Sequence, residues 1–244
     1  MDAFQEFDQP NAPQKSSGEI ISHAFGIYKG IFLYVLLAMA IYIVASLLVK
    51  TFSGFDQQMM MEEIRDSAGD YSSLRIWEIP GLKFYYGISG LVGILAAPLY
   101  VGLMYIANKY SYKQQIQISD LFIGYRQNFL NIILYAVISS IILVISMMLC
   151  FLPFFFVLPF LMLGYPILLF ENKSAMEALS KSFQIAKENY GVFLGTTLLG
   201  MLISISGLLL CIVGILLTMY FYLIVMYSLY CAYLGRPRQI EVKN

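Results

Sequence analysis

The sequence has 244 residues, of which 59% are hydrophobic and 12% are charged, and its formal net charge is zero. Soluble domains carry about 25% charged residues, so this chain has too few charges to cover a water-exposed surface. The composition excludes a soluble globular protein and predicts a membrane protein. Since the sequence has no block of basic residues, nothing in its charge indicates nucleic-acid binding.

Four segments contain no Asp, Glu, Lys, Arg or His, and their lengths predict the membrane spans. Residues 30–49 and 84–107 have 20 and 24 residues, which fits one helix each because crossing a bilayer takes roughly 20 apolar residues. Residues 129–170 and 190–235 have 42 and 46 residues. Each of these two segments is therefore expected to form a helical hairpin.

The two hairpins are expected to break where residues disfavour a helix. Pro153 interrupts helical hydrogen bonding in the first hairpin, and the second break is expected between Ser206 and Gly214. The chain is then an all-α, polytopic membrane protein. Its six transmembrane helices are expected at residues 30–49, 84–107, 129–150, 154–170, 190–208 and 213–234.

The distribution of basic residues predicts the orientation in the membrane. With six spans both termini share one side, which collects 11 of the 15 Lys and Arg residues, whereas the other four lie in the loop of residues 50–83. By the positive-inside rule, the polar N-terminal tail (1–15) and the C-terminal tail (235–244) are cytoplasmic, and loop 50–83 is extracytoplasmic. Acidic residues near the start are unlike a basic signal-peptide region, so we expect the first span to be retained.

The segments before the first, third and fifth spans repeat one residue pattern. The second copy follows the first at an offset of 97 residues, and the third follows the first at an offset of 158 residues. Residues 16–234 are therefore expected to form one membrane domain with three copies of an amphipathic interfacial helix and a transmembrane hairpin. The copies cover about residues 16–107, 113–170 and 174–234.

Each repeat is expected to place an aromatic and a basic side chain at the membrane interface. Ser16 with Glu19, and Ser174 with Glu177, have the spacing of a capping box, so helices are predicted to start there. The basic residue that ends the pattern is expected where the chain turns into the bilayer, and it can reach lipid phosphates. These segments are either topological anchors or a docking collar for a partner or lipid head groups. The equivalent residues are Phe25, Lys29, Phe122, Arg126, Phe183 and Lys187.

Small residues predict close helix packing in two of the spans. Gly191 and Gly195 have the GxxxG spacing, and Ser89, Gly93 and Ala97 repeat small residues at the same interval. Such spacing lets the backbones of neighbouring transmembrane helices approach each other. The fifth and second spans are therefore expected to present faces for helix contacts.

The spans lack the residues that catalysis or metal binding needs. His23 is the one histidine of the sequence, which leaves a transition-metal site with almost no ligands. Cys150, Cys211 and Cys231 have no CxxC spacing and are expected to be packing residues. We expect no enzyme activity, no catalytic residue, no cofactor and no metal site.

Three stretches of the chain resemble a known group of membrane proteins. They are GEIISHAFGIYKGIF at 18–32, APLYVGLMYIANKY and ISDLFIGYRQNF within 97–129, and ENKSAMEALSKSFQIAKENYGVFLG ending at Gly195. These resemble bacterial six-span integral-membrane families that include the membrane domain of some glycerophosphodiester phosphodiesterases. The resemblance implies a multi-pass protein of the bacterial cytoplasmic (inner) membrane. Because the motifs are structural in that group, it implies no active-site residue.

Missing catalytic chemistry and repeated, chemically mild surfaces favour a non-enzymatic scaffold or accessory subunit. Such a protein would contact membrane lipids and another membrane or envelope protein. The alternative is a carrier or lipid-handling protein for a neutral or lipidic substrate. That alternative is motivated by prolines that could break transmembrane helices at a binding site, namely Pro98, Pro153, Pro159 and Pro166.

Overall fold

The computed structural model describes the fold over residues 12–66, 75–149, 152–210, 214 and 218–237. Within these residues the secondary structure is helical and includes no β-strand. The chain divides into two compact units. One contains the chain up to Ala38 and from Ala97 onward, and the other contains Met39–Ala96.

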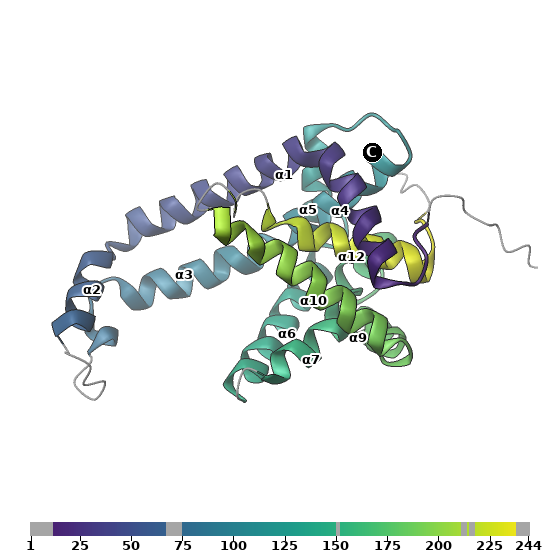
Figure 1. The fold of residues 1–244 in the computed structure, drawn as a ribbon. Coiled ribbons are helices and arrows are strands. Elements are labelled where there is room, and N and C mark those ends of the chain that lie inside the picture. The colour runs from purple at the N-terminus through teal and green to yellow at the C-terminus, as the bar shows by residue number, and fades with distance from the viewer. Residues whose placement is uncertain (1–11, 67–74, 150–151, 211–213, 215–217, 238–244) are drawn as a thin grey trace, which may run out of the picture. The chain divides into compact units, whose positions relative to one another are not determined.

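The first helix, α1 (Ser17–Ser53), is unbroken over 37 residues and forms the long purple and blue ribbon of Figure 1. It starts after Ser16, whose hydroxyl accepts a hydrogen bond of 3.4 Å from the Glu19 N–H, as expected for a cap. A turn was expected at Lys29; α1 continues as a helix through this residue, and Figure 1 shows that the helix bends within its purple part.

The unit of residues 39–96 contains the end of α1 and three further elements. These are α2 (Gln57–Asp66), the 3-10 helix η1 (Ile76–Glu78) and α3 (Leu82–Leu95). The expected loop 50–83 is thus partly helical over its described residues.

An aromatic contact and a glycine turn order this unit. The Phe55 ring stacks on Tyr85 with centroids 5.0 Å apart. Gly81 has a φ of 78°, and a Cβ there would collide with the Ser53 carbonyl oxygen. Only glycine fits such a turn without strain.

The other unit contains the remaining described helices. In chain order they are α4 (Ala97–Ser111), η2 (Ile118–Phe122), α5 (Ile123–Arg126), α6 (Phe129–Met148), α7 (Leu152–Leu161), α8 (Gly164–Phe170), α9 (Ala175–Glu188), α10 (Tyr190–Ser206), η3 (Gly207–Leu210) and α12 (Phe221–Leu234).

The expected break at Pro153 is confirmed. Helix α6 ends at Met148, and Pro153 lies in the first turn of α7, where its missing N–H costs no helical hydrogen bond. The expected span 154–170 is further divided, because α7 ends at Leu161 and α8 begins at Gly164. The Tyr135 hydroxyl donates a hydrogen bond of 2.7 Å to the Leu161 carbonyl at this interruption.

The second expected hairpin break is confirmed at its start, since α10 ends at Ser206. A Cβ on Gly207 would collide with the Gly214 carbonyl oxygen, which shows that the backbone approaches itself closely at the turn. The Thr218 hydroxyl donates a hydrogen bond of 2.7 Å to the Ser204 carbonyl. Residues 211–213 and 215–217 of the expected sixth span lie outside the described residues.

The described helices identify a multi-pass membrane protein with four candidate spans. These are Ser17–Ser53, Leu82–Ser111, Phe129–Met148 and Leu152–Phe170. Helices α9 and α10 meet at 105° and would count as a fifth span if taken together. The described part of α12 has 14 residues, fewer than the roughly 20 that a span needs.

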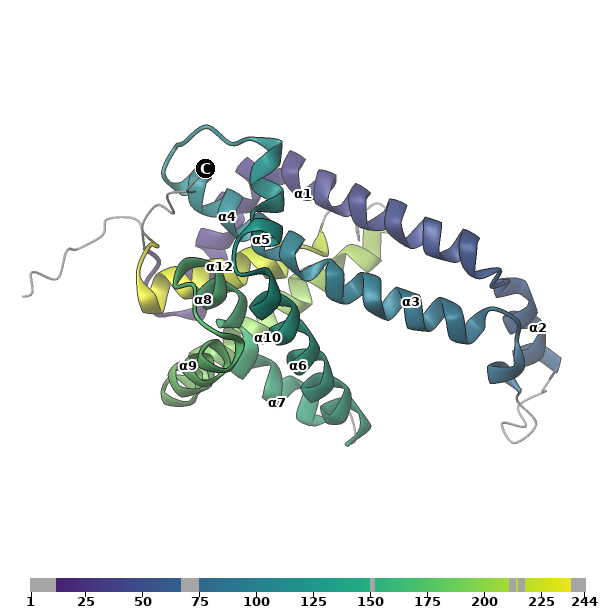
Figure 2. The ribbon, with the colours of Figure 1, turned by 180° about the vertical axis from the view of Figure 1, so that it is seen from behind.

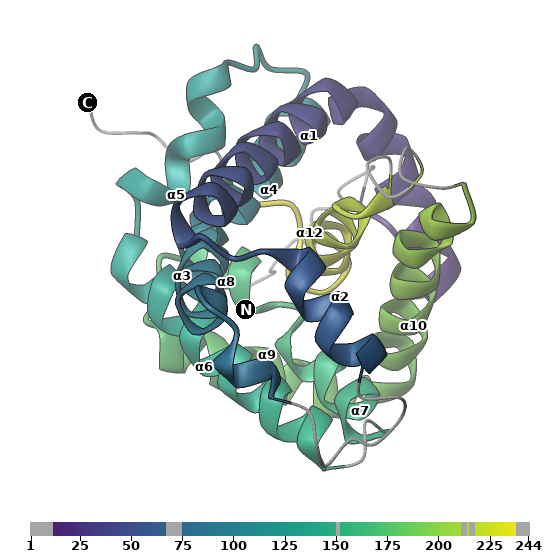
Figure 3. The same ribbon diagram turned by 90° about the vertical axis from the view of Figure 1, so that its left-hand side faces the viewer.

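Aromatic side chains fill the centre of the larger unit. Tyr135, Phe193, Phe221 and Tyr227 are fully buried there. Helix α12 packs against α4, α8 and α10, and Figure 3 shows it between α4 and α10. The core of this unit therefore forms around α12.

Glycine at position 102 is required by the packing of this unit. A Cβ on Gly102 would collide with the Leu121 backbone, whereas a Cβ on Gly191 would meet no described atom within 4 Å. We predict that Gly102→Ala destabilises the protein by about 1–3 kcal/mol through overpacking, and that Gly191→Ala does not. Thermal unfolding in mild detergent measures both, and equal unfolding temperatures for the two variants would contradict the packing described.

Candidate functional site

The three segments that carry the repeated pattern form helices of different lengths. The first is the start of α1, and the third is α9, whose Ser174 and Glu177 form the expected capping box. The second is shorter, because it consists of η2 and the single-turn helix α5. Its N-terminal cap is Gln117 with Asp120, and Asn128, with a φ of 53°, ends the segment before α6.

Ion pairs join two of these segments to the preceding helix of the chain. Asp120 of η2 lies 2.7 Å from the Lys109 ammonium in the last turn of α4, with side chains only 12% and 16% exposed. Lys181 of α9 lies 2.6 Å from the Glu171 carboxylate, at the end of α8. Each pair therefore fastens a pattern segment to a helix end.

The start of α1 is joined to α12 by a hydrogen bond at the matching position. His23 Nδ1 lies 3.0 Å from the Ser228 hydroxyl oxygen. His23, Asp120 and Lys181 are separated by 97 and 61 residues, the same offsets as the repeated pattern. We call the contacts of these three residues the junctions.

The residue after each junction residue is fully buried. Ala24, Leu121 and Ser182 each have 0% exposure. The Ser182 hydroxyl donates to the Phe160 carbonyl at 2.6 Å and accepts from the Leu163 N–H at 3.1 Å. It thus satisfies backbone groups that the break between α7 and α8 leaves without a helical partner.

The expected aromatic residues pack against rings of neighbouring helices while keeping an exposed edge. Phe25 lies 4.4 Å from Phe221 with an interplanar angle of 38°, and Phe183 lies 4.8 Å from Phe160 with an angle of 34°. Their exposed fractions are 39% and 48%. Phe122 is half-buried.

The expected basic residues all lie at the surface. Lys29, Arg126 and Lys187 are exposed. Lys187 lies directly before the bend of 105° between α9 and α10, which is where the pattern predicts that the chain changes direction.

Helix α9 has one buried and one exposed face. Its buried face contains small residues and rests on α6, α7 and α8, and Figure 2 shows α8 beside α9. Its exposed face mixes the apolar side chains of Met176 and Phe183 with the polar side chains of Glu177 and Gln184. An exposed face with both kinds of side chain suits a membrane interface, where lipid tails and water meet.

The three glycines expected at helix contacts differ in how closely other atoms approach them. A Cβ on Gly195 would lie 2.8 Å from the Ser17 hydroxyl oxygen, so α10 closely approaches the start of α1 there. A Cβ on Gly93 or on Gly191 would meet no described atom within 4 Å. Within the part of the chain that the structure describes, Gly195 alone of these three lies at a close approach.

A polar network next to His23 was not predicted from the sequence. The buried Tyr227 hydroxyl donates a hydrogen bond of 3.0 Å to the Asn108 side-chain oxygen. Arg236 donates a hydrogen bond of 2.6 Å to the Ser111 carbonyl. An open cleft of about 600 Å³ lies beside this network and is lined by His23, Gly26, Ile27, Tyr110, Ser111, Lys113, Gln114 and Arg236.

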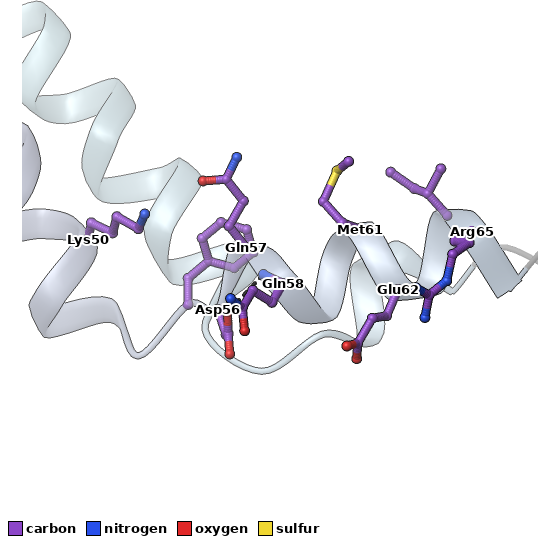
Figure 4. A pocket seen from close by; sticks show the side chains of 9 residues that line it. Lys50, Asp56, Gln57, Gln58, Met61, Glu62 and Arg65 are labelled. Carbon is purple, nitrogen blue, oxygen red and sulfur yellow. Dashed lines mark hydrogen bonds between the residues drawn. The ribbon is translucent and has the colours of Figure 1, made fainter.

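A second open cleft lies in the unit of residues 39–96, where Lys50, Phe55 and α2 line it. Figure 4 shows that Gln57 and Met61 point to one side of α2, whereas Glu62 points to the other. Its side chains do not converge on one point, so we assign no site to it. Among the described residues, no group of three or more His, Cys, Asp or Glu side chains is arranged to hold a metal ion.

Comparison of the chain with protein-family models, with curated proteins and with solved structures finds no match. The resemblance to the membrane domain of glycerophosphodiester phosphodiesterases therefore stays a prediction from the sequence.

The junction between Asp120 and Lys109 can be tested by a double-mutant cycle. Lys109→Met should destabilise the protein by about 2–3 kcal/mol, because it leaves the Asp120 carboxylate largely buried without its cation. Asp120→Asn in the same chain should restore most of that loss. Unfolding in increasing denaturing detergent measures the four proteins, and additive effects of the two changes would contradict the pairing.

Proposed function

We propose that this protein is a non-enzymatic scaffold or accessory subunit of the bacterial inner membrane. In this proposal six spans form three repeats, and both termini face the cytoplasm. The three pattern segments form a docking collar that contacts another membrane or envelope protein. The exposed basic residues of the collar, Lys29, Arg126 and Lys187, would pair with acidic side chains of that partner.

The matching environment of equivalent residues carries this proposal. The three segments lie at offsets of 97 and 61 residues from one another. In each segment one residue forms the junction and the next residue is fully buried. The sixth residue after the junction residue is an exposed Lys or Arg in all three. A segment that served only as a loose anchor would need no repeated polar attachment. The junctions hold the backbone of these segments in place, which lowers the entropy cost of binding.

The aromatic contacts support a repeated architecture as well. Phe160 and Phe221 are 61 residues apart, the same offset that separates the second and third pattern segments. The Phe160 ring packs against Phe183 of the third segment, and the Phe221 ring packs against Phe25 of the first segment. The larger unit thus uses similar contacts at two places.

The docking collar is tested by reversing its charges. We predict that the triple variant Lys29→Glu, Arg126→Glu and Lys187→Glu inserts and folds like the unaltered protein but loses a partner that co-purifies from native membranes. The control is Lys83→Glu, which makes the same type of change at an exposed residue outside the collar. Affinity purification in mild detergent with quantitative mass spectrometry compares them.

Retention of every co-purified protein by the folded triple variant would contradict the collar. The same conclusion would follow if the unaltered protein purified without any stoichiometric partner.

The proposed orientation is tested by thiol labelling of intact cells. Gln58 and Ser180 are exposed residues in loop 50–83 and in α9. We predict that Gln58→Cys reacts with a membrane-impermeant thiol reagent and that Ser180→Cys reacts only after lysis. The unaltered protein measures background labelling, and the opposite pattern would reverse the orientation.

A further inference from the structure

The open cleft beside His23 gathers basic side chains from three elements of the larger unit. His23 belongs to α1, Lys113 follows α4, and Arg236 follows α12. The described residues that line the cleft include no Asp or Glu. A concave surface with cationic groups and without carboxylates attracts anions.

Arg236 is held in place before any ligand binds. Its Nη2 donates to the Ser111 carbonyl at 2.6 Å, and its guanidinium lies 4.5 Å from the centre of the Tyr112 ring. The Tyr112 hydroxyl in turn donates to the Pro237 carbonyl at 3.2 Å. A guanidinium ordered in this way loses little conformational entropy when it binds an anion.

The sequence positions of these residues match the depth of lipid phosphates. The charge-free segments begin at Gly30 and end at Ala107 and Gly235. His23, Lys113 and Arg236 lie seven, six and one residues outside these limits. Basic side chains directly outside an apolar span reach the phosphate layer of the bilayer.

We propose that this cleft binds the phosphate group of an anionic phospholipid. Lys113 and Arg236 supply positive charge, the Gln114 amide can donate a hydrogen bond, and Ile27 offers an apolar wall beside the lipid glycerol. A phosphate that contacts these two cations forms charge-assisted hydrogen bonds, which are the stronger kind. This binding requires no partner protein, so it can fail or succeed independently of the docking collar.

The test uses the full chain purified in a mild non-ionic detergent. The protein is titrated with phosphatidylglycerol, which is anionic, and with phosphatidylcholine, whose choline compensates the phosphate charge. Native mass spectrometry measures the bound fraction of each lipid. We expect tighter binding of phosphatidylglycerol, and weaker binding as salt is raised, because salt screens exposed charges.

Three single variants locate the binding. Lys113→Gln removes an exposed cation and should weaken phosphatidylglycerol binding about tenfold. Gln114→Glu places a carboxylate in the cleft and should weaken it at least as much. Lys83→Gln removes an exposed cation that does not line the cleft, and it should bind like the unaltered protein. Thermal unfolding of each variant checks that it is folded.

The proposal would be overturned if the folded Lys113→Gln and Gln114→Glu variants bound phosphatidylglycerol as tightly as the unaltered protein does. Equal binding of phosphatidylcholine and phosphatidylglycerol would overturn it too. Binding of inorganic phosphate is measured as well. If inorganic phosphate bound at Lys113 while phosphatidylglycerol did not, the cleft would be a site for a soluble phosphate compound, and the lipid assignment would be wrong.

Discussion

The arrangement of the larger unit depends on polar contacts that fasten each pattern segment to a helix earlier or later in the chain. Asp120 with Lys109 and Lys181 with Glu171 are partly buried ion pairs, and His23 with Ser228 is a hydrogen bond. In a chain with 12% charged residues, few charges can serve this purpose. Apolar contacts alone would leave the register between a short segment and its helix poorly defined, whereas a paired charge fixes it.

The three segments close a cycle of contacts in the larger unit. The second segment packs against α4 and the third against α7 and α8. The first contacts α12 through Phe25 and His23. Each segment thus rests on a helix that ends another copy of the pattern. This order supports the proposed repeats, in which the same exposed basic position recurs in each copy.

Local sequence signals predicted the parts of the fold that neighbouring residues decide. Pro153 marks the start of α7, and the Ser174 and Glu177 box marks the start of α9. The same reasoning expected a turn at Lys29, whereas α1 is a continuous helix that bends within its first part. It also did not predict that the second segment would be only a 3-10 helix and one α-helical turn.

The basic cleft and the contact of His23 with Ser228 join residues far apart in the sequence, so the sequence did not mark them. The two ion pairs join residues only 11 and 10 positions apart, but nothing in the repeated pattern singled out their positions. The pattern was recognised by shared serine, phenylalanine and basic residues, but the junction position carries His, Asp and Lys, which have different chemistry. What these residues share is a partner in space. The cleft likewise combines side chains from α1, α4 and the end of α12, and no spacing in the sequence marks it.

Hydrogen–deuterium exchange of the purified protein tests the role of the junctions most directly. The account predicts that amides of α9 (Ala175–Glu188) and of Ile118–Arg126 exchange slowly in the unaltered protein. Lys181→Ala should accelerate exchange in α9 alone, and Asp120→Ala should accelerate it in residues 118–126 alone. Fast exchange of both segments in the unaltered protein, or no local acceleration in either variant, would contradict the claim that junctions hold these segments in place.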